Sequence, residues 1–453
     1  MKSRLLQSPY PSNAPSDGPD VEPTAGIVAF DPHSPQIEAA QRRTIRTLLG
    51  SQVCGGMGLV SGYSVAALLA NDLTGSKTLA GLSAACLSIG AAIASFPLAR
   101  IMAKSGRRPG LRTGYLLGAF GAFLAVLAAI TGFFPLLPLG VAGIGAGNAA
   151  NMATRYAAAD LAKPERRAQN IGVIVWATTI GSGFGSLISL SVFDPLGQKL
   201  GLPDYGGSFL MGALLFMVGA AIIETRLHPD PLVLAGGVGS TQAEGRLPFT
   251  VSMSLILAHP KARLAVLGMM ISQATMVGTM TLTPLFMVEE GGQTKGAVSL
   301  MLFSHIMGMY ALSPFVGRLT DVVGRYPMLI TAGVLCAVGA VLAATTPATE
   351  FLGLTAGQTI VGLAWSFGII SSSGLLTESF PVHQRASVQG AGDLCMAAFG
   401  AMAGISAGAI VAYRSYRDLN LAAATLGIVL VVAVLLTSVS PKARTTPSAA
   451  AYT

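Results

Sequence analysis

Four side chains with soft donor atoms recur at helical spacing in the middle of the chain. Met276 and Met280 lie four residues apart, and so do His305 and Met309. Residues four apart share one face of a helix. Thioether sulfur selects Cu(I) and imidazole also suits copper, whereas Mg²⁺ and Ca²⁺ prefer oxygen ligands. The two pairs therefore indicate a site for a soft cation such as Cu(I).

Core packing is the competing explanation for the same methionines. Eight of the 18 methionines lie between residues 269 and 309, and Met commonly fills irregular gaps in apolar cores. A Met-x-x-x-Met spacing is therefore weak evidence by itself. His305 adds weight, because it is the one His of five that falls inside an apolar block, at the same depth as Met276 in the preceding block.

The elements that carry these residues are predicted to be membrane-spanning helices. Only 11% of the 453 residues are charged and 52% are hydrophobic, whereas a typical soluble protein is about 25% charged. So few charges cannot cover a soluble surface, and the lipid bilayer is the expected surrounding. The net charge of +8 comes from basic residues between apolar blocks. No patch typical of nucleic-acid binding is present, so no nucleic-acid partner is expected.

Twelve apolar blocks are each near the ~20 residues that a helix needs to cross a bilayer. The predicted class is therefore an all-α integral membrane protein with twelve transmembrane helices. The blocks are 47–70, 78–98, 113–132, 134–154, 169–191, 208–224, 264–288, 297–316, 328–346, 351–374, 386–411 and 419–439.

The basic residues test this map, because Lys and Arg accumulate on the cytoplasmic side of a membrane protein. With a cytoplasmic N-terminus and twelve spans, 23 of the 28 Lys and Arg fall inside. An odd number of spans would scramble this bias. We therefore predict cytoplasmic N- and C-termini and a multi-pass protein of the cytoplasmic (inner) membrane. The five basic residues predicted outside are Lys77, Lys199, Lys295, Arg414 and Arg417.

The polar stretches divide the chain. Residues 1–44 are rich in Pro and Ser and are predicted to be a disordered cytoplasmic tail. Two six-helix halves, 45–224 and 263–440, flank a central cytoplasmic loop over 225–262, and 441–453 form a second cytoplasmic tail. All four Cys lie within predicted spans, so disulfide bonds are not expected.

An internal repeat at an offset of 218 residues relates the two halves. It links the loop after the second block to the loop after the eighth, and the loop after the fourth block to that after the tenth. Two six-helix halves in parallel repeat are the architecture of a secondary transporter. The matching residues are Arg100, Gly106 and Arg107 with Arg318, Gly324 and Arg325, and Asp160 and Arg167 with Glu378 and Arg385.

The second-half loop resembles the loop motif G-x-L-x-D-x-x-G-R of the major facilitator superfamily. The match runs from Gly317 through Asp321 and Gly324 to Arg325, while the first-half copy has Ala103 in place of the Asp. The resemblance implies that these loops latch the two halves together, or that Asp321 and Arg325 only anchor a tight turn. The other loop acids, Asp160 and Glu378, are either ion-pair partners of the loop arginines or solvated helix ends.

Within that superfamily, the soft residues resemble the copper importers of the CcoA type. These importers carry Met-x-x-x-Met on the seventh span and His-x-x-x-Met on the eighth. The resemblance implies that Met276, Met280, His305 and Met309 bind copper during transport. Copper ion or a small copper complex would then be the transported substrate, and no resident cofactor is expected.

Other polar or soft groups inside the spans are accessory candidates. Cys54 and Met57 extend a path of soft ligands or pack against small residues. Asp393 is a proton-coupling acid or the partner of a cytoplasmic-side Arg. The remaining pair, Asn148 and Asn151, lines the cavity or forms interhelical hydrogen bonds.

The expected function is alternating-access uptake of copper through a midplane Met/His site. The alternative is a proton-coupled transporter, working in efflux, of a small organic compound or drug, with Asp393 as the coupling acid. A non-transporting receptor is disfavoured because both loop motifs are recognisable. No nucleophile–base constellation or carboxylate pair stands out, so the chain is not expected to be an enzyme.

Overall fold

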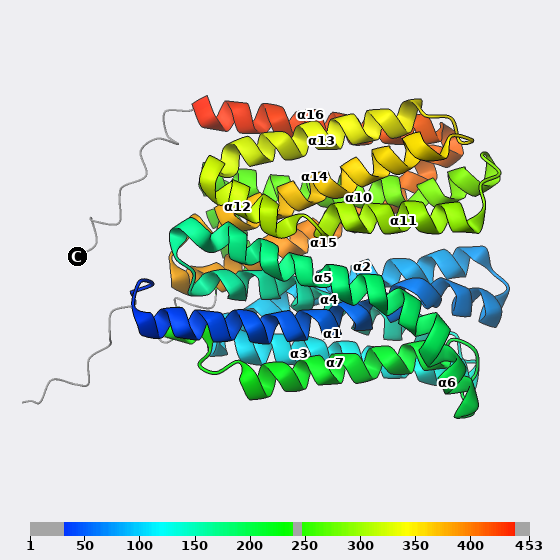
Figure 1. Ribbon diagram of the computed structural model, residues 1–453, viewed down its shortest axis with the longest axis horizontal. Coiled ribbons are helices and arrows are strands. Elements are labelled where there is room, and N and C mark those ends of the chain that lie inside the picture. Colours follow the sequence, from blue (N-terminus) through cyan, green and yellow to red (C-terminus); the bar gives the residue numbers. More distant parts are fainter. Residues whose placement is uncertain (1–30, 239–246, 440–453) are drawn as a thin grey trace, which may run out of the picture.

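Long helices that run side by side form the protein in the computed structural model, which describes residues 31–238 and 247–439 (Figure 1). The predicted tails and residues 239–246 of the predicted central loop lie wholly or partly outside the described residues. The helices are α1 Pro35–Thr74, α2 Lys77–Ser105, α3 Arg107–Thr131, α4 Leu136–Asp160, the 3₁₀ turn η1 Pro164–Arg166, α5 Arg167–Ile188, the π-helix η2 Ser189–Phe193, α6 Asp194–Lys199, α7 Gly206–Arg226, α8 Pro231–Leu234, α9 Phe249–Ala258, α10 Pro260–Glu289, α11 Lys295–Tyr310, α12 Ser313–Val323, α13 Arg325–Thr345, α14 Phe351–Glu378, α15 Val382–Tyr413 and α16 Tyr416–Val439.

Each of the twelve predicted blocks is helical, although the eighth, 297–316, is divided between α11 and α12. Among the described residues, ten helices are long and apolar enough to cross a membrane. The blocks without such a helix carry α4 and α5, which have 25 and 22 residues. Glycines and the amides of Asn148 and Asn151 lower the hydropathy of α4. Twelve membrane crossings therefore stay a prediction, while the multi-pass helical fold is confirmed.

The first helix begins earlier than expected. Residues 35–44 were predicted to belong to a disordered tail, but α1 starts at Pro35. Ser34 caps this start by accepting a hydrogen bond from the backbone N–H of Ile37, and Pro35 suits the first helical position. Lys163 also pairs with Glu38 across 2.5 Å. Local capping thus extends the helix into a segment that composition alone marks as tail.

The two halves have separate hydrophobic cores. One cluster is built from α1 to α7 and the other mainly from α10 to α16, which Figure 1 shows as lower and upper groups of helices. Small residues bring helices close in both halves: Gly121 of α3 lies against Gly140 of α4, and Gly339 of α13 against Gly357 of α14. This parallel arrangement agrees with the internal repeat.

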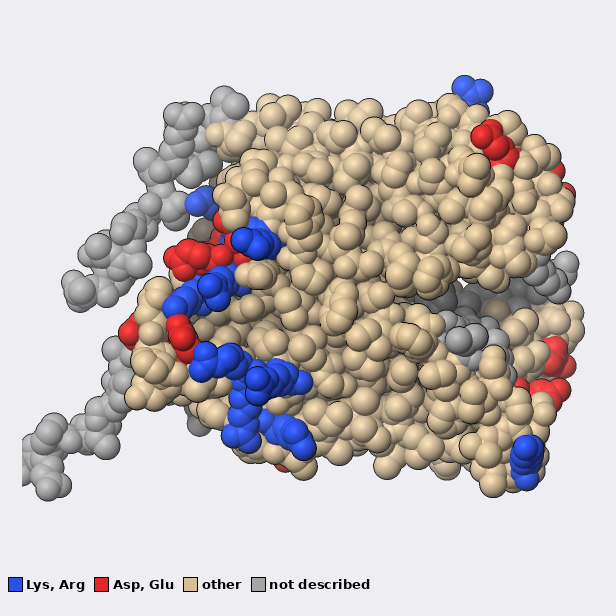
Figure 2. Space-filling view, in the orientation of Figure 1, with Lys and Arg blue, Asp and Glu red and all other residues tan. Residues whose placement is uncertain are grey.

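The first described helix, α1, begins at the same end of the bundle as that at which the last, α16, finishes (Figure 1). We call this the basic end, because Lys and Arg gather there (Figure 2). It carries the turns at Gly106, residues 161–166, Gly324 and residues 379–381. At the opposite end the surface between the halves is hollowed (Figure 2). The common end for both termini agrees with an even number of spans, and its cytoplasmic location stays a prediction.

The link between the halves contains regular structure. The region predicted as a central loop, 225–262, contains α8 and α9, and its described residues pack against the basic end. Ala235 and Leu234 join Ile37 and Leu161 in a small hydrophobic cluster. Part of the predicted loop is therefore an element of the fold.

Candidate functional site

His305 is buried at the centre of the C-terminal half, with 1% of its surface exposed. Its Nδ1 lies 2.6 Å from the backbone carbonyl oxygen of Gln358 on α14. Because a carbonyl only accepts, Nδ1 must be the donor, and Nε2 is left with a free lone pair. Nε2 has no hydrogen-bond partner among the described residues. An unpaired acceptor in a buried place is available to a ligand.

Gln358 ties this histidine to other helices. Its side-chain Nε2 donates to Thr283 Oγ1 across 2.7 Å, and its Oε1 accepts from Thr279 Oγ1 across 3.3 Å, both on α10. The hydroxyl groups of Thr283 and Tyr416 are 2.8 Å apart. The result is a polar network in which His305 Nε2 is the one ring nitrogen left without a protein partner.

The four predicted soft ligands are divided between two hydrophobic clusters. Met309 is buried in the large cluster of the C-terminal half, and Met276 packs against the same cluster. Met280 instead packs against a separate cluster formed by Met287 and its neighbours. The two helices that carry these residues contact each other little: α11 packs mainly along α14, and α10 packs along α15 and α14.

The placement of α14 has a physical consequence for the predicted copper site. His305 points its Nδ1 to α14, and the side chain of Gln358 occupies the space toward α10. Among the described residues, no group of three or more His, Cys, Asp or Glu is placed to hold a metal ion. All four residues stay candidates, and Met280 differs from the other three in packing against another hydrophobic cluster.

The accessory soft residues take part in helix packing. Met57 lies against Gly181 and Gly185 of α5, and Cys54 lies close to Gly219 of α7. They therefore face different neighbours within the N-terminal half. All four cysteines are free.

The two asparagines of α4 differ in their contacts. Asn151 is fully buried and its Oδ1 accepts from the hydroxyl of Tyr115 on α3 across 2.9 Å. This is the interhelical bond that one of the two predictions described, although Nδ2 has no partner. Asn148 is half-buried, and its buried Oδ1 also has no hydrogen-bond partner. Both amides thus keep capacity for a further hydrogen bond.

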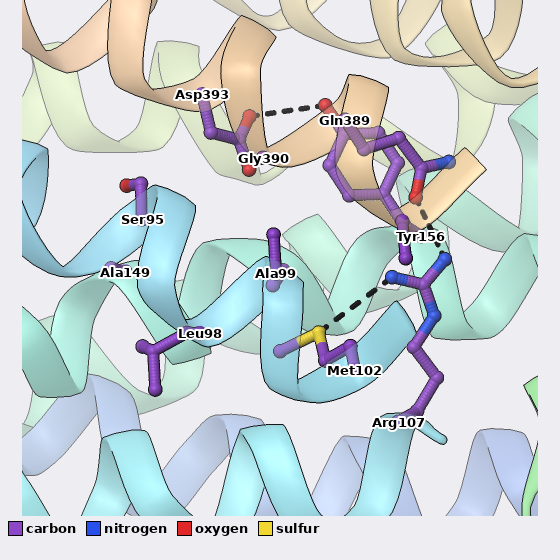
Figure 3. A pocket seen from close by; sticks show the side chains of 12 residues that line it. Ser95, Leu98, Ala99, Met102, Arg107, Ala149, Tyr156, Gln389, Gly390 and Asp393 are labelled. Carbon is purple, nitrogen blue, oxygen red and sulfur yellow. Dashed lines mark hydrogen bonds between the residues drawn. The ribbon is translucent and has the colours of Figure 1, made fainter. Parts of the chain in front are cut away.

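Asp393 joins the two halves of the protein. Its Oδ1 lies 2.5 Å from Nη2 of Arg155 on α4, and both residues are buried. The hydroxyl of Tyr156 donates to the same oxygen across 3.0 Å, as Figure 3 shows. Arg155 also donates to Ser373 of α14 across 2.9 Å, and its Cζ lies 4.4 Å from the centre of the Tyr156 ring. The predicted pairing of Asp393 with an Arg near the basic end is therefore present.

A second buried cation crosses the boundary between the halves nearby. Arg107 forms an ion pair with Asp160 at 2.7 Å, and its Nη2 donates to Oε1 of Gln389 on α15 across 2.7 Å. Both charged groups are at most 1% exposed. The ion pair expected for Asp160 is thus confirmed and is not a solvated helix end. A cavity of about 10 Å³, room for about one water, lies between Arg107, Tyr156 and Asp393 (Figure 3).

The second-half loop makes a different latch. Asp321 accepts hydrogen bonds from the backbone N–H groups of Ala168 and Gln169, at 3.1 and 2.8 Å, and so caps α5 of the other half. Arg325 pairs with Asp321 at 2.9 Å and with Glu378 at 2.6 Å. The carboxylate therefore does more than anchor its own turn.

The structure explains why the first-half copy tolerates Ala103. The 3₁₀ turn η1 interrupts the chain before α5, so the first N–H groups of α5 need an outside acceptor such as Asp321. In contrast, α15 runs unbroken from Val382, and the residues that match Ala168 and Gln169 already lie inside it. No carboxylate is needed at position 103, which is buried.

The remaining motif residues shape the loops. Gly106 and Gly324 have φ values of 95° and 101°, which favour glycine. Gly317 lies against the backbone of Ala168 and Gln169, so a side chain there would overlap the other half. Arg100 is exposed at the basic end. The loop glycines thus permit the close contact of the halves.

Three residues of the buried polar contacts between the halves were not predicted from the sequence. Arg155 stands just beyond the predicted end of the fourth block, so it was counted only as an orientation charge. Tyr156 and Gln389 are polar residues without a motif. A signal for Arg155 was present, because it lies four residues after Asn151 and directly follows the predicted fourth block.

These features define a class of protein. Two repeated helical halves that meet through latches at one end and separate at the other are the architecture of a secondary transporter. The chain belongs to the Major Facilitator Superfamily, whose family model matches residues 48–293 and 264–452. Proteins of this family are transporters, so the chain is a transporter and not an enzyme.

Similar proteins cover nearly the whole chain. The uncharacterized MFS-type transporter YdeG of Bacillus subtilis is 32% identical over 90% of this chain and 95% of its own length. The riboflavin transporter RfnT of Brucella anthropi is 25% identical over 84% of this chain and 92% of its own length. The crystal structure of the E. coli fucose:proton symporter FucP (N162A) has a TM-score of 0.62 at 16% identity, covering 87% of this chain and 99% of that one.

Proposed function

We propose that this chain is a proton-coupled transporter of a small, uncharged organic solute, with the basic end in the cytoplasm. The observation that carries the proposal is the buried pair of Asp393 and Arg155, which belongs to both halves at once. A carboxylate within a membrane-spanning helix is costly and marks coupling sites in transporters.

The pair suits proton coupling for an electrostatic reason. When Asp393 is ionised, it neutralises Arg155 and helps to hold the halves together near the basic end. Protonation of Asp393 removes that attraction and leaves the guanidinium of Arg155 without a counterion in a desolvated place. The closed arrangement then loses stability, and opening toward the cytoplasm becomes easier. Proton binding and alternation of access are thereby linked.

The polar groups farther from the basic end favour an uncharged solute. Those described around His305 and Trp365, inside the C-terminal half, are an imidazole, amides, hydroxyls and an indole. Trp365 donates to Gln273 across 2.8 Å, and its ring lies edge-to-face with Tyr310 at 5.4 Å. Amide and aromatic groups suit a planar solute with hydrogen-bonding edges. The relative named as a riboflavin transporter supports riboflavin as the first probe.

The proposal is tested with purified protein in proteoliposomes that contain a pH-sensitive dye. A panel of uncharged solutes that begins with riboflavin is added, and solute-dependent proton flux is recorded. A flux that needs the protein and continues in the presence of a copper chelator is expected. Solute uptake that is insensitive to an imposed pH gradient would contradict proton coupling.

Copper uptake is a second candidate, favoured by one specific observation. His305 Nε2 is buried, has a free lone pair and shares its helix with the buried Met309. Such neutral ligands suit a soft monovalent ion. Among the predicted ligands, Met276 would be the third, since it packs against the same cluster as Met309.

The copper hypothesis predicts unequal effects of single substitutions. His305→Ala and Met276→Ala are expected to lower Cu(I) uptake by cells at least ~10-fold, because loss of metal-site partners typically weakens binding by 10–100-fold. Met280→Ala should change uptake little, since Met280 packs elsewhere. His259→Ala, at an exposed position, is the control. Undiminished uptake in both His305→Ala and Met276→Ala would exclude the metal role.

A further inference from the structure

In the N-terminal half, Arg107 with its partners Asp160 and Gln389 forms the first-half latch. One carboxylate of the segment that follows α7 binds to this latch. We call residues 227–238 the connector. Asp230 of the connector accepts hydrogen bonds from the backbone N–H groups of Arg107 and Arg108, at 3.0 and 2.6 Å. The same side chain caps its own short helix by accepting from Leu232 and Val233. The Asp230 carboxylate thus caps the N-termini of two helices, α3 and α8.

The start of α3 needs this carboxylate. Its N-cap position is Gly106, which has no side chain to accept a hydrogen bond. The first N–H groups of a helix are unpaired within the helix and carry partial positive charge. Arg107 and Arg108 add two full positive charges at the same place. An aspartate that approaches from outside the helix therefore satisfies the donors and balances part of the charge.

Further contacts hold the connector over the boundary between the halves. Arg108 contacts His228 through its guanidinium and lies 3.8 Å from Glu224. Leu232 is fully buried in the core of the N-terminal half. At its far end, Gly237 lies against Val382, the first residue of α15. The connector thus touches the N-terminal half and the helix of the C-terminal half that carries Gln389.

The two latches differ in what fixes their arginines. In the C-terminal half, Arg325 is held by Asp321, which precedes it by four residues on the same loop motif. The repeat-related position in the N-terminal half is Ala103, so Arg107 has no carboxylate from its own motif. Asp230 holds the backbone of Arg107 instead, and the Arg107 guanidinium is then aimed at Asp160 and Gln389.

We infer that Asp230 is a positioning residue for closure of the basic end. It acts through Arg107: the connector fixes the turn between α2 and α3, and this turn places the guanidinium that bridges the two halves. Loss of the Asp230 carboxylate leaves Arg107 free to shift, so the closed arrangement becomes less populated. The inference concerns gating and does not depend on the identity of the solute or on proton coupling.

The test measures access to the closed end directly. Ala153 lines the small cavity beside Arg107 and Asp393, so Ala153→Cys is introduced into full-length protein without its four native cysteines. Labelling by a membrane-impermeant maleimide from the basic side is compared with and without Asp230→Ala. We expect labelling to be several-fold faster with Asp230→Ala, as an opened gate requires. Asp204→Ala, an exposed aspartate that bonds Gln198, is the matched control and should label at the parent rate.

A purely structural role gives a different result. It would lower the yield of folded, monodisperse protein without changing the labelling rate of the folded fraction. If Asp230→Ala does not fold, Asp230→Asn, which keeps the shape but loses the charge and one acceptor oxygen, supplies the comparison. Labelling at the parent rate in the folded variant would overturn the inference. Asp321→Ala is the positive reference, because it removes the latch of the other half.

Discussion

Asp393→Asn is expected to abolish proton-driven accumulation of solute while leaving solute exchange across the membrane measurable. An asparagine fits the space of the aspartate but cannot bind and release a proton, so the driving ion is uncoupled. It also leaves Arg155 without its counterion, at a cost of about 3–5 kcal/mol for an unpaired buried charge. That cost corresponds to a loss of roughly 100-fold or more in a rate that depends on closure.

The measurement separates coupling from folding. Reconstituted protein is assayed for uphill uptake under an imposed pH gradient and for exchange of labelled against unlabelled solute. Asp418→Asn, at an exposed aspartate bonded to Ser415, is the control and should retain both activities. Uphill uptake that persists with Asp393→Asn would eliminate this aspartate as the coupling group.

A double variant then separates the effect of losing the Asp393 carboxyl from the effect of leaving the Arg155 charge unpaired. Asp393→Asn combined with Arg155→Gln removes both buried charges, so no uncompensated guanidinium remains. The double variant should regain the thermal stability that the single variant loses, yet proton-driven accumulation should stay absent. Recovery of accumulation would show that the single variant fails only because the Arg155 charge is unpaired, and that another group carries the proton.

The repeat loops were predictable because their chemistry is local. One short motif contains Gly317, Asp321, Gly324 and Arg325, and the repeat offset of 218 residues maps Arg325 onto Arg107. Spans were predictable for a similar reason, since a run of apolar residues needs only its own composition to be recognised. The expected ion pairs followed from opposite charges at the ends of neighbouring spans.

The arrangement of spans around one another was not predictable in this way. Apolar periodicity does not say which helix lies beside which, so the position of α14, which contacts both α10 and α11, could not be predicted. The start of α1 at Pro35 depends on the Ser34 cap and on contacts with α4, which composition does not register. Asp230 was missed because it belongs to no motif and acts across 123 residues of sequence on Arg107.

Gly390→Leu is expected to disfavour closure of the basic end and to slow transport in folded protein. Gly390 of α15 faces Ala99 of α2, and a Cβ added at Gly390 would overlap the methyl group of Ala99. Overpacking of this kind typically costs about 1–3 kcal/mol, which shifts an equilibrium between closed and open forms by roughly 5–150-fold. Because the overlap exists only when the halves meet, the open form does not carry the cost.

The same helix supplies the control for this substitution. Gly408 of α15 has nothing within 4 Å of an added Cβ, so Gly408→Leu adds the same side chain to the same helix without touching the other half. Maleimide labelling at Ala153→Cys should be faster with Gly390→Leu and unchanged with Gly408→Leu, and only Gly390→Leu should slow solute exchange. Normal exchange with Gly390→Leu would mean that the contact of α2 with α15 does not form during the transport cycle. A leucine that fits there would also require α15 to move away from Ala99, and the pairs of Arg107 with Gln389 and of Arg155 with Asp393 would then separate together, since both partners lie on that helix.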